Sequence, residues 1–200
     1  MHASDRSSPI RHRVAAVAVA ACGLLASGAA VALDLAQLAA QLARVPAGEA
    51  TFVEKRRVEM LDRTIESSGK LSFQAPDTFV RETTSPRREV LTVTGNTLSM
   101  TVAGRPRTMQ LDAVPEAAVV VEAIRGVLTG NRATLERVFV PTVGGDAQRW
   151  TLDLVPREAR LRNQVASIRV AGGGSLVREV QILLADGDRS TMAIEPVAGR

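Results

Sequence analysis

The chain has 200 residues, with 25 Lys and Arg against 21 Asp and Glu, which gives a formal net charge of +4. Hydrophobic residues make up 46% and charged residues 23%, the composition of an ordinary globular domain. Aromatic residues are only 2%, which argues against a nucleic-acid surface built on base stacking.

The N-terminal segment has the three parts of a secretory signal peptide. Basic residues such as Arg11 and Arg13 precede an uncharged apolar stretch over 14–25, and Ala30-Val31-Ala32 supplies small residues for cleavage. The stretch is shorter than the roughly 20 residues of a transmembrane helix. We therefore expect residues 1–32 to be a signal peptide cleaved after Ala32, with export to the periplasm, and residues 33–200 to form a single domain.

A second interpretation of this segment stays open. Val19-Ala20-Ala21-Cys22 also resembles a lipobox, in which Cys22 would be lipidated and anchor the protein to a membrane. The apolar stretch before Cys22 is short for a signal peptide of that kind, which favours cleavage after Ala32.

The predicted mature chain lacks most catalytic side chains. Both histidines, His2 and His12, and the single cysteine, Cys22, precede Ala32, and the sequence has no tyrosine. Nucleophiles activated by histidine, zinc sites made of Cys and His, and disulfides are thereby excluded. Only carboxylates and two lysines, Lys55 and Lys70, remain for acid–base catalysis, and paired carboxylates can serve a glycosidase. We expect no cofactor, no metal and no enzymatic activity.

The N-terminal half of the predicted domain is a helix followed by strands. Leu35, Leu38 and Leu42 predict a helix over 33–45, with Asp34 as its cap. From residue 50 the hydrophobic period changes to two, which predicts strands at 50–60, 65–74, 78–84, 88–94, 97–103 and 106–111. Turn residues such as Gly95-Asn96 separate them.

The C-terminal half repeats this order. Pro115 suits the first turn of a helix over 115–129, and Gly130 ends it. A short helical turn is expected at 132–136 and another within the charged connection 157–164. Strands are predicted at 138–143, 148–155, 165–171, 176–185 and 190–196.

These elements predict an α+β fold that is mainly β. About eleven antiparallel strands are many for a flat sheet, so we expect the sheet to curve into an incomplete barrel. Because one face of each strand is apolar, that face must be covered. Two helices are too few to cover it completely, which predicts a helical lid over an apolar cavity.

Several weak motifs, in order, carry a resemblance to a known family. They are ATFVE at 50–54, GKLSFQAPDTFVR at 69–81, GNTL at 95–98, LDLVP at 152–156 followed by IRV at 168–170, and VQI at 180–182 followed by DGDRST at 186–191. The match as a whole covers essentially all of residues 33–196. The chain resembles the LolA-like periplasmic lipoprotein carriers, which are related to the outer-membrane acceptor LolB.

The resemblance implies an open β-barrel whose helical lids hold the acyl chains of a lipoprotein, with no chemistry catalysed. It further implies a monomer that receives acylated lipoprotein or lipid cargo from an inner-membrane release complex and delivers it to an outer-membrane acceptor. A LolB-like anchored acceptor is the alternative if Cys22 is lipidated. A paralogue that carries a glycolipid or polyene lipid is a further alternative.

Two positions depart from the family pattern. Ala75 stands where the carriers usually have a gating arginine before the hairpin proline, and Glu54 stands where a glutamine is usual. Arg81 is the candidate that replaces the missing gating residue.

Alternation and the resemblance together predict the acyl-binding cavity. Its expected lining is Phe52, Leu71, Phe73, Leu91, Val93, Leu98, Met100, Val102, Val121, Ile124, Leu128, Trp150, Leu152, Leu154, Ile168, Val170, Val180 and Ile182. Within this set, Ile124 and Leu128 are expected to face Leu98, Met100 and Val102 across the cavity.

Overall fold

The computed structural model describes residues 32–197. The predicted signal peptide therefore lies outside the described residues except for Ala32, and so does Cys22 with its possible lipidation. None of the helices within the described residues is long and apolar enough to span a membrane.

The described chain begins with helix α1, Leu35–Leu42. The prediction that Asp34 caps it is confirmed: Gln37 N donates to Asp34 Oδ1 over 2.7 Å, and Asp34 N donates to Gln37 Oε1 over 3.1 Å. This reciprocal capping box satisfies two backbone donors that the first turn leaves free. Leu38 and Leu42 are buried one helical turn apart and turn the same face of α1 towards the core.

A single antiparallel sheet of eleven strands follows, as the alternation predicts. The strands are β1 Ala47–Val58, β2 Arg63–Gln74, β3 Thr78–Ser85, β4 Glu89–Thr94, β5 Thr97–Val102, β6 Arg105–Gln110, β7 Phe139–Gly145, β8 Trp150–Pro156, β9 Val165–Gly173, β10 Leu176–Leu184 and β11 Arg189–Pro196. A 3-10 helix, Glu59–Leu61, links the two longest strands, β1 and β2.

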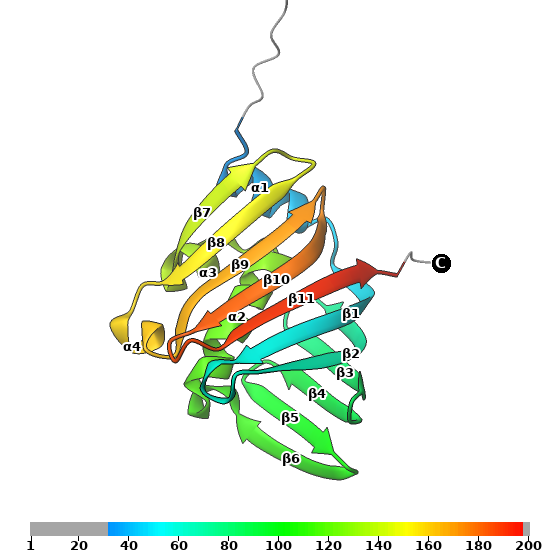
Figure 1. Ribbon diagram of the computed structural model, residues 1–200. Helices are drawn as coiled ribbons and strands as arrows, with labels where there is room; N and C mark the ends of the chain where they lie inside the picture. Colours follow the sequence, from blue (N-terminus) through cyan, green and yellow to red (C-terminus); the bar gives the residue numbers. More distant parts are fainter. Residues whose placement is uncertain (1–31, 198–200) are drawn as a thin grey trace, which may run out of the picture.

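The sheet consists of two meanders, β1–β6 and β7–β11, which are joined in its middle. Its order is β6-β5-β4-β3-β2-β1-β11-β10-β9-β8-β7, so the first strand, β1, pairs with the last strand, β11, at the centre of the sheet. Strands β6 and β7 are the two edges, and the described sheet does not close into a complete barrel. Figure 1 shows the sheet curving around the helices. The predicted incomplete barrel is confirmed.

Helices α1, α2 and α3 all lie on one side of this sheet (Figure 1). The long middle helix is α2, Pro115–Leu128, which follows a 3-10 turn at Leu111–Ala113. The two helical turns expected elsewhere form α3, Arg132–Val138, and α4, Ala159–Arg162. Asn131 caps α3 by accepting from Thr134 N over 3.0 Å.

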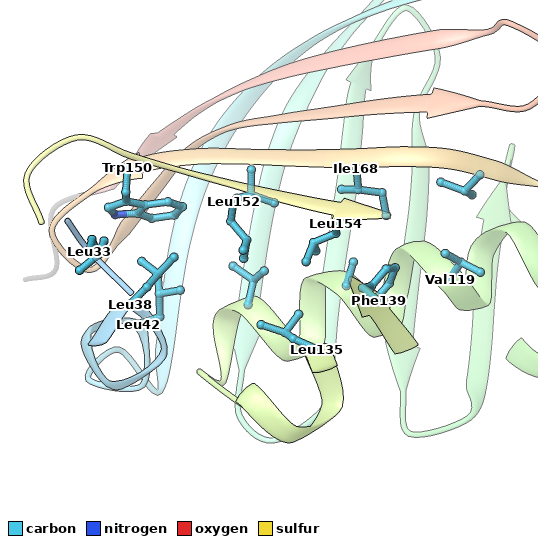
Figure 2. Packing of buried hydrophobic residues seen from close by; sticks show 14 residues of the cluster. Leu33, Leu38, Leu42, Val119, Leu135, Phe139, Trp150, Leu152, Leu154 and Ile168 are labelled. Carbon is cyan, nitrogen blue, oxygen red and sulfur yellow. The ribbon is translucent and has the colours of Figure 1, made fainter. Parts of the chain in front are cut away.

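Two hydrophobic cores lie between the helices and the sheet. The large core joins α1, α2 and α3 to β7, β8 and β9; Figure 2 shows side chains of β8 and β9 pointing at Leu38, Leu42 and Leu135 of the helices. The small core joins the first turns of α2 to β4 and β5 through Val93, Leu98 and Leu111. Helix α2 contributes to both, and it therefore bridges the two meanders.

Candidate ligand-binding cavity

A cavity of about 560 Å³ lies between the two cores, over the centre of the sheet. Its volume falls within the roughly 300–1,000 Å³ of pockets that hold small molecules. Helix α2 forms one wall, and the inward-facing residues of β1–β4 and β9–β11 form most of the opposite one. Most of the side chains on both walls are apolar.

Eleven of the eighteen apolar residues predicted from the sequence line this cavity, and so does Arg81. The eleven are Leu71, Phe73, Leu91, Val93, Leu98, Val121, Ile124, Leu128, Val170, Val180 and Ile182. They come from both meanders and from α2.

Five of the predicted residues belong to the interior and do not line the cavity. Trp150, Leu152, Leu154 and Ile168 are at most 1% exposed and lie in the large core, where α1 and α3 cover them (Figure 2). Phe52 is 2% exposed beneath Arg81, whose Cζ lies 4.7 Å from the ring centre. All five occupy the predicted face of the sheet, but other side chains or helices fill the space above them.

Met100 and Val102 also require correction. They line a second hollow of about 400 Å³ near the edge of the sheet, together with Ala103, Arg105 and Arg107. The side chains of α2 pack on Leu98 of the same strand but are not part of this hollow. Ile124 and Leu128 therefore share the main cavity with Leu98 and not with the other two residues.

The sequence analysis missed other lining residues. Leu42 and Val45 enter from α1 and the loop after it, Phe79 stacks on Phe73 with ring centres 5.1 Å apart, and Met192 and Ile194 enter from β11. The alternation of Met192 and Ile194 with exposed neighbours contained the signal for β11. No pattern within the loop after α1 indicated Val45.

A polar cluster interrupts the apolar wall. Arg81 Nη2 donates to Glu54 Oε2 over 2.5 Å, and the side chains are only 30% and 13% exposed. Ser67 Oγ donates to the same oxygen over 3.2 Å, and Ser190 donates to Glu54 Oε1. Side chains from three strands other than β1, namely β2, β3 and β11, thus donate to one partly buried carboxylate on β1. We name Glu54, Ser67, Arg81 and Ser190 the polar cluster.

The cluster keeps Glu54 ionised. Burial opposes the charged form, but the hydrogen bond from Ser190 and the charge of Arg81 outweigh it, so the pKa of Glu54 lies below its ordinary value. A general acid requires a raised pKa, so this carboxylate is suited to binding and not to proton donation near neutral pH.

A second ion pair, between Arg56 and Asp188, also lines the cavity on its sheet side. Asp188 accepts from the backbone N–H of Glu59 and from Arg56 Nη2, each over 3.0 Å. These two bonds lower the pKa of Asp188. They fix the β1–β2 hairpin to the start of β11. Within residues 32–197, no cluster of three or more His, Cys, Asp or Glu side chains is arranged to hold a metal ion.

Arg125 connects α2 to the sheet. Its Nη2 donates to the carbonyl oxygen of Gly95, in the β4–β5 turn, over 2.9 Å, while its Nη1 donates to Glu122 over 2.6 Å. Arg81 is the gating candidate from the sequence, but it donates to Glu54, Ser67 and Thr83, which all lie on strands, and it has no hydrogen bond to a helix within the described residues. Arg125 escaped the sequence analysis because a charged residue on a helix usually faces water.

The chain matches the family described as outer membrane lipoprotein carrier protein LolA-like over residues 27–197. No curated protein sequence matches it. Among solved structures, it is similar to the LolA superfamily protein NE2245 from Nitrosomonas europaea, with 10% identity, 78% of this chain and 88% of that chain covered, and a TM-score of 0.41.

Two other solved structures are similar at comparable levels. LprF from Mycobacterium bovis has 10% identity and a TM-score of 0.37, with 83% of this chain and 94% of that chain covered. A DUF1329 family protein from Desulfovibrio piger has 7% identity and a TM-score of 0.44, with 84% of this chain and 92% of that chain covered.

Proposed function

The chain belongs to the LolA-like family of outer membrane lipoprotein carrier proteins, and we propose that it shields the acyl chains of a lipoprotein, or of another acylated lipid, during transfer from the inner to the outer membrane. The observation that carries the proposal is the cavity of about 560 Å³ between α2 and the sheet. Most of the side chains that line it are apolar, and no chemistry is assigned to it.

The physical reason for such a carrier is the cost of hydrocarbon in water. Each CH₂ group that leaves an apolar environment costs about 0.8 kcal/mol, so an acyl chain does not cross an aqueous compartment unprotected at a useful rate. Apolar side chains such as Leu91, Ile124 and Val180 supply a replacement environment on three elements. Release then requires α2 to move from the sheet at modest cost.

The cellular setting is part of the proposal. The N-terminal sequence supports export to the periplasm with cleavage after Ala32, and the family supports an inner-membrane donor complex and an outer-membrane acceptor as partners. We propose that the carrier acts as a monomer. If Cys22 is lipidated, the same domain is instead an anchored acceptor. Mass spectrometry of the mature N-terminus distinguishes the two, since a chain that begins at Leu33 supports the carrier.

The decisive experiment is native mass spectrometry of the protein purified from its own periplasm. We expect an extra mass that organic extraction removes and that contains acyl chains. Val180→Trp, which fills the cavity from β10, is expected to lose that mass. The matched control is Val155→Trp on β8, where the side chain is 40% exposed and lies away from the cavity. Unliganded wild-type protein under these conditions would contradict the proposal.

A further inference from the structure

Resting on the proposed function, we propose that Arg81 binds the ligand itself: it donates hydrogen bonds to the ester or amide carbonyl oxygens that join acyl chains to an uncharged head. The cavity then selects acylated molecules with neutral carbonyl linkages over free fatty acids, which carry a carboxylate. Arg81 lines the cavity between two apolar residues, because its neighbours in the sheet register are Leu71 on β2 and Leu91 on β4.

Part of the Arg81 guanidinium has no protein acceptor. Nη2 donates to Glu54 and Ser67, and Nε donates to Thr83 Oγ1 over 3.4 Å. Within residues 32–197, no side-chain or backbone oxygen accepts from Nη1. Among these residues, Arg125 Nε is the one side-chain nitrogen that is both fully buried and without a hydrogen-bond partner. Since Nη1 of Arg81 has no partner either, it must be accessible to solvent or to a ligand. Its two N–H groups are thus available to a molecule in the cavity.

The position of these donors is fixed before any ligand arrives. The Glu54 carboxylate lies 2.5 Å from Nη2, and the guanidinium stacks 4.7 Å above the centre of the Phe52 ring. A planar guanidinium held at both places loses little freedom when it donates further bonds. Both carboxylate oxygens of the polar cluster already accept hydrogen bonds: Glu54 accepts from Arg81, Ser67 and Ser190. The cluster therefore offers donors, and a ligand must supply acceptors.

The charges around the cavity decide which acceptor fits. Seven ionisable side chains line it: Glu49, Glu54, Arg56, Arg81, Glu116, Asp188 and Arg189. Four carboxylates against three guanidinium groups leave no positive excess. A ligand carboxylate would approach Glu54 in an apolar surrounding, where like charges repel strongly. A carbonyl oxygen accepts the same bonds without adding charge.

The test compares three ligands that share a sixteen-carbon chain: hexadecanoyl glycerol, which has an ester carbonyl; hexadecyl glycerol ether, which lacks it; and the hexadecanoate anion. Each displaces an environment-sensitive dye from the purified protein at pH 8. We expect the ester to bind at least about tenfold more tightly than the ether, which corresponds to about 1.4 kcal/mol, and more tightly than the anion.

Variants assign the preference to Arg81. Glu54→Gln combined with Arg81→Met removes both charges of the pair without leaving either buried alone. We expect this double variant to lose the preference for the ester over the ether, so that the ratio of the two affinities falls to about one. The matched control is Asp153→Asn with Arg169→Met, which removes an ion pair between β8 and β9 on the exposed face, and is expected to keep the preference.

The outcomes separate this inference from the proposed function. Equal displacement by all three ligands means that the cavity binds acyl chains and that Arg81 does not read the linkage. Tighter binding of the anion, or an ester preference that survives in the double variant, overturns the inference in the same way. Failure of all three ligands to displace the dye overturns the proposed function, and this inference with it.

Discussion

At the residue scale, the partly buried Glu54–Arg81 pair is the least expected feature of an apolar cavity. An isolated charge there would be costly, and each partner offsets the burial of the other. Because Ser67 and Ser190 also donate to Glu54, the carboxylate is satisfied on both oxygens. The pair thus joins β1 to β3 across β2 and gives the wall a fixed polar point.

This pair predicts a pH dependence of stability. The pKa of Glu54 is lowered on folding, so the unfolded chain binds its proton more readily. The stabilisation is fully present above the ordinary pKa of 4.5 and is lost as the pH falls through the lower pKa of the folded state. Glu54→Gln should therefore cost about 1–3 kcal/mol at pH 7 and progressively less in acid.

Urea unfolding at a series of pH values measures this effect. The only tryptophan, Trp150, is buried and reports unfolding by its fluorescence. Glu66→Gln is the control, because the Glu66 side chain is 64% exposed and its pairing with Lys55 lies on the surface. If the curves of Glu54→Gln and wild type stay parallel from pH 7 to pH 3, the pair does not stabilise the fold.

The sequence did not predict which residues form the polar cluster. Glu54 and Arg81 were each noticed, but they lie 27 positions apart and meet only because β1, β2 and β3 adopt one particular register. Alternation predicts which face of a strand a residue occupies. It does not predict which residues of three strands become neighbours, since a shift of two positions preserves the pattern.

At the element scale, the stability of the domain depends on Gly130, the glycine that follows the end of helix α2. Gly130 has φ of +61°, and a Cβ atom there would lie 2.1 Å from the carbonyl oxygen of Ala39 in α1. Gly130→Ala therefore meets both backbone strain and a clash with another backbone. We expect the variant to lose more than about 2 kcal/mol of stability, which lowers the melting temperature by more than about 4 °C.

Gly104 supplies the matched control for this change. Its φ is +75°, yet apart from Gly104 itself and its two chain neighbours no heavy atom of residues 32–197 lies within 4 Å of the added Cβ. Gly104→Ala should show the backbone strain alone, about 1–2 kcal/mol. Thermal melts of the two variants side by side measure the difference. Equal losses would mean that α1 and the end of α2 are not held as closely as the distance indicates.

A substitution on the cavity-facing side of α2 should lower lipid affinity much more than it lowers the stability of the apo protein. Ile124→Asn places an amide in the cavity wall, where water can reach it when no ligand is bound. We expect lipid affinity to fall about tenfold while the apo protein loses only about 1 kcal/mol of stability. Dye displacement and a thermal melt of the same preparation measure both quantities.

Leu154→Ala is the contrasting variant. Leu154 is 0% exposed in the large core, so its truncation should cost about 2–5 kcal/mol of stability and leave the affinity of the folded protein nearly unchanged. An Ile124→Asn protein that is strongly destabilised yet binds normally would place Ile124 in the core and not in the cavity wall.

The contrast between these two residues explains how far the sequence reaches. Every strand and the long helix were predicted within a few residues, because periods of two and of about 3.6 are properties of short segments. Leu154 and Val180 have the same alternating signature, yet one is covered by α3 and its neighbours and the other lines the cavity. The difference depends on where α1 and α3 cross the sheet, and no local pattern encodes that position.

At the scale of the whole molecule, the two meanders meet in one strand pair and under one helix. Strands β1 and β11 join them in the sheet, and α2 packs on the large core through Val119 and Val127 and on the small core through Ala117 and Val121. The cavity occupies the region between the two cores. A ligand there contacts both meanders and α2 at once, so binding strengthens the connection between the halves.

This arrangement predicts that a ligand stabilises the entire domain. A molecule that binds only the folded protein at 100 times its Kd adds about 2.7 kcal/mol, which raises the melting temperature of a domain of this size by about 5–11 °C. Hexadecanoyl glycerol below its critical micelle concentration is the ligand, and the melt is followed by Trp150 fluorescence.

The hydrophobic dye gives a second measurement of the same cavity. The apo protein should bind the dye while fully folded, and added hexadecanoyl glycerol should release the dye over the same concentrations that raise the melting temperature. Val180→Trp, with its cavity filled, should show neither dye binding nor a shift, while Val155→Trp should behave as the wild type. A dye signal that appears only on unfolding would mean that α2 and the sheet close on each other in solution and leave no space for an acyl chain.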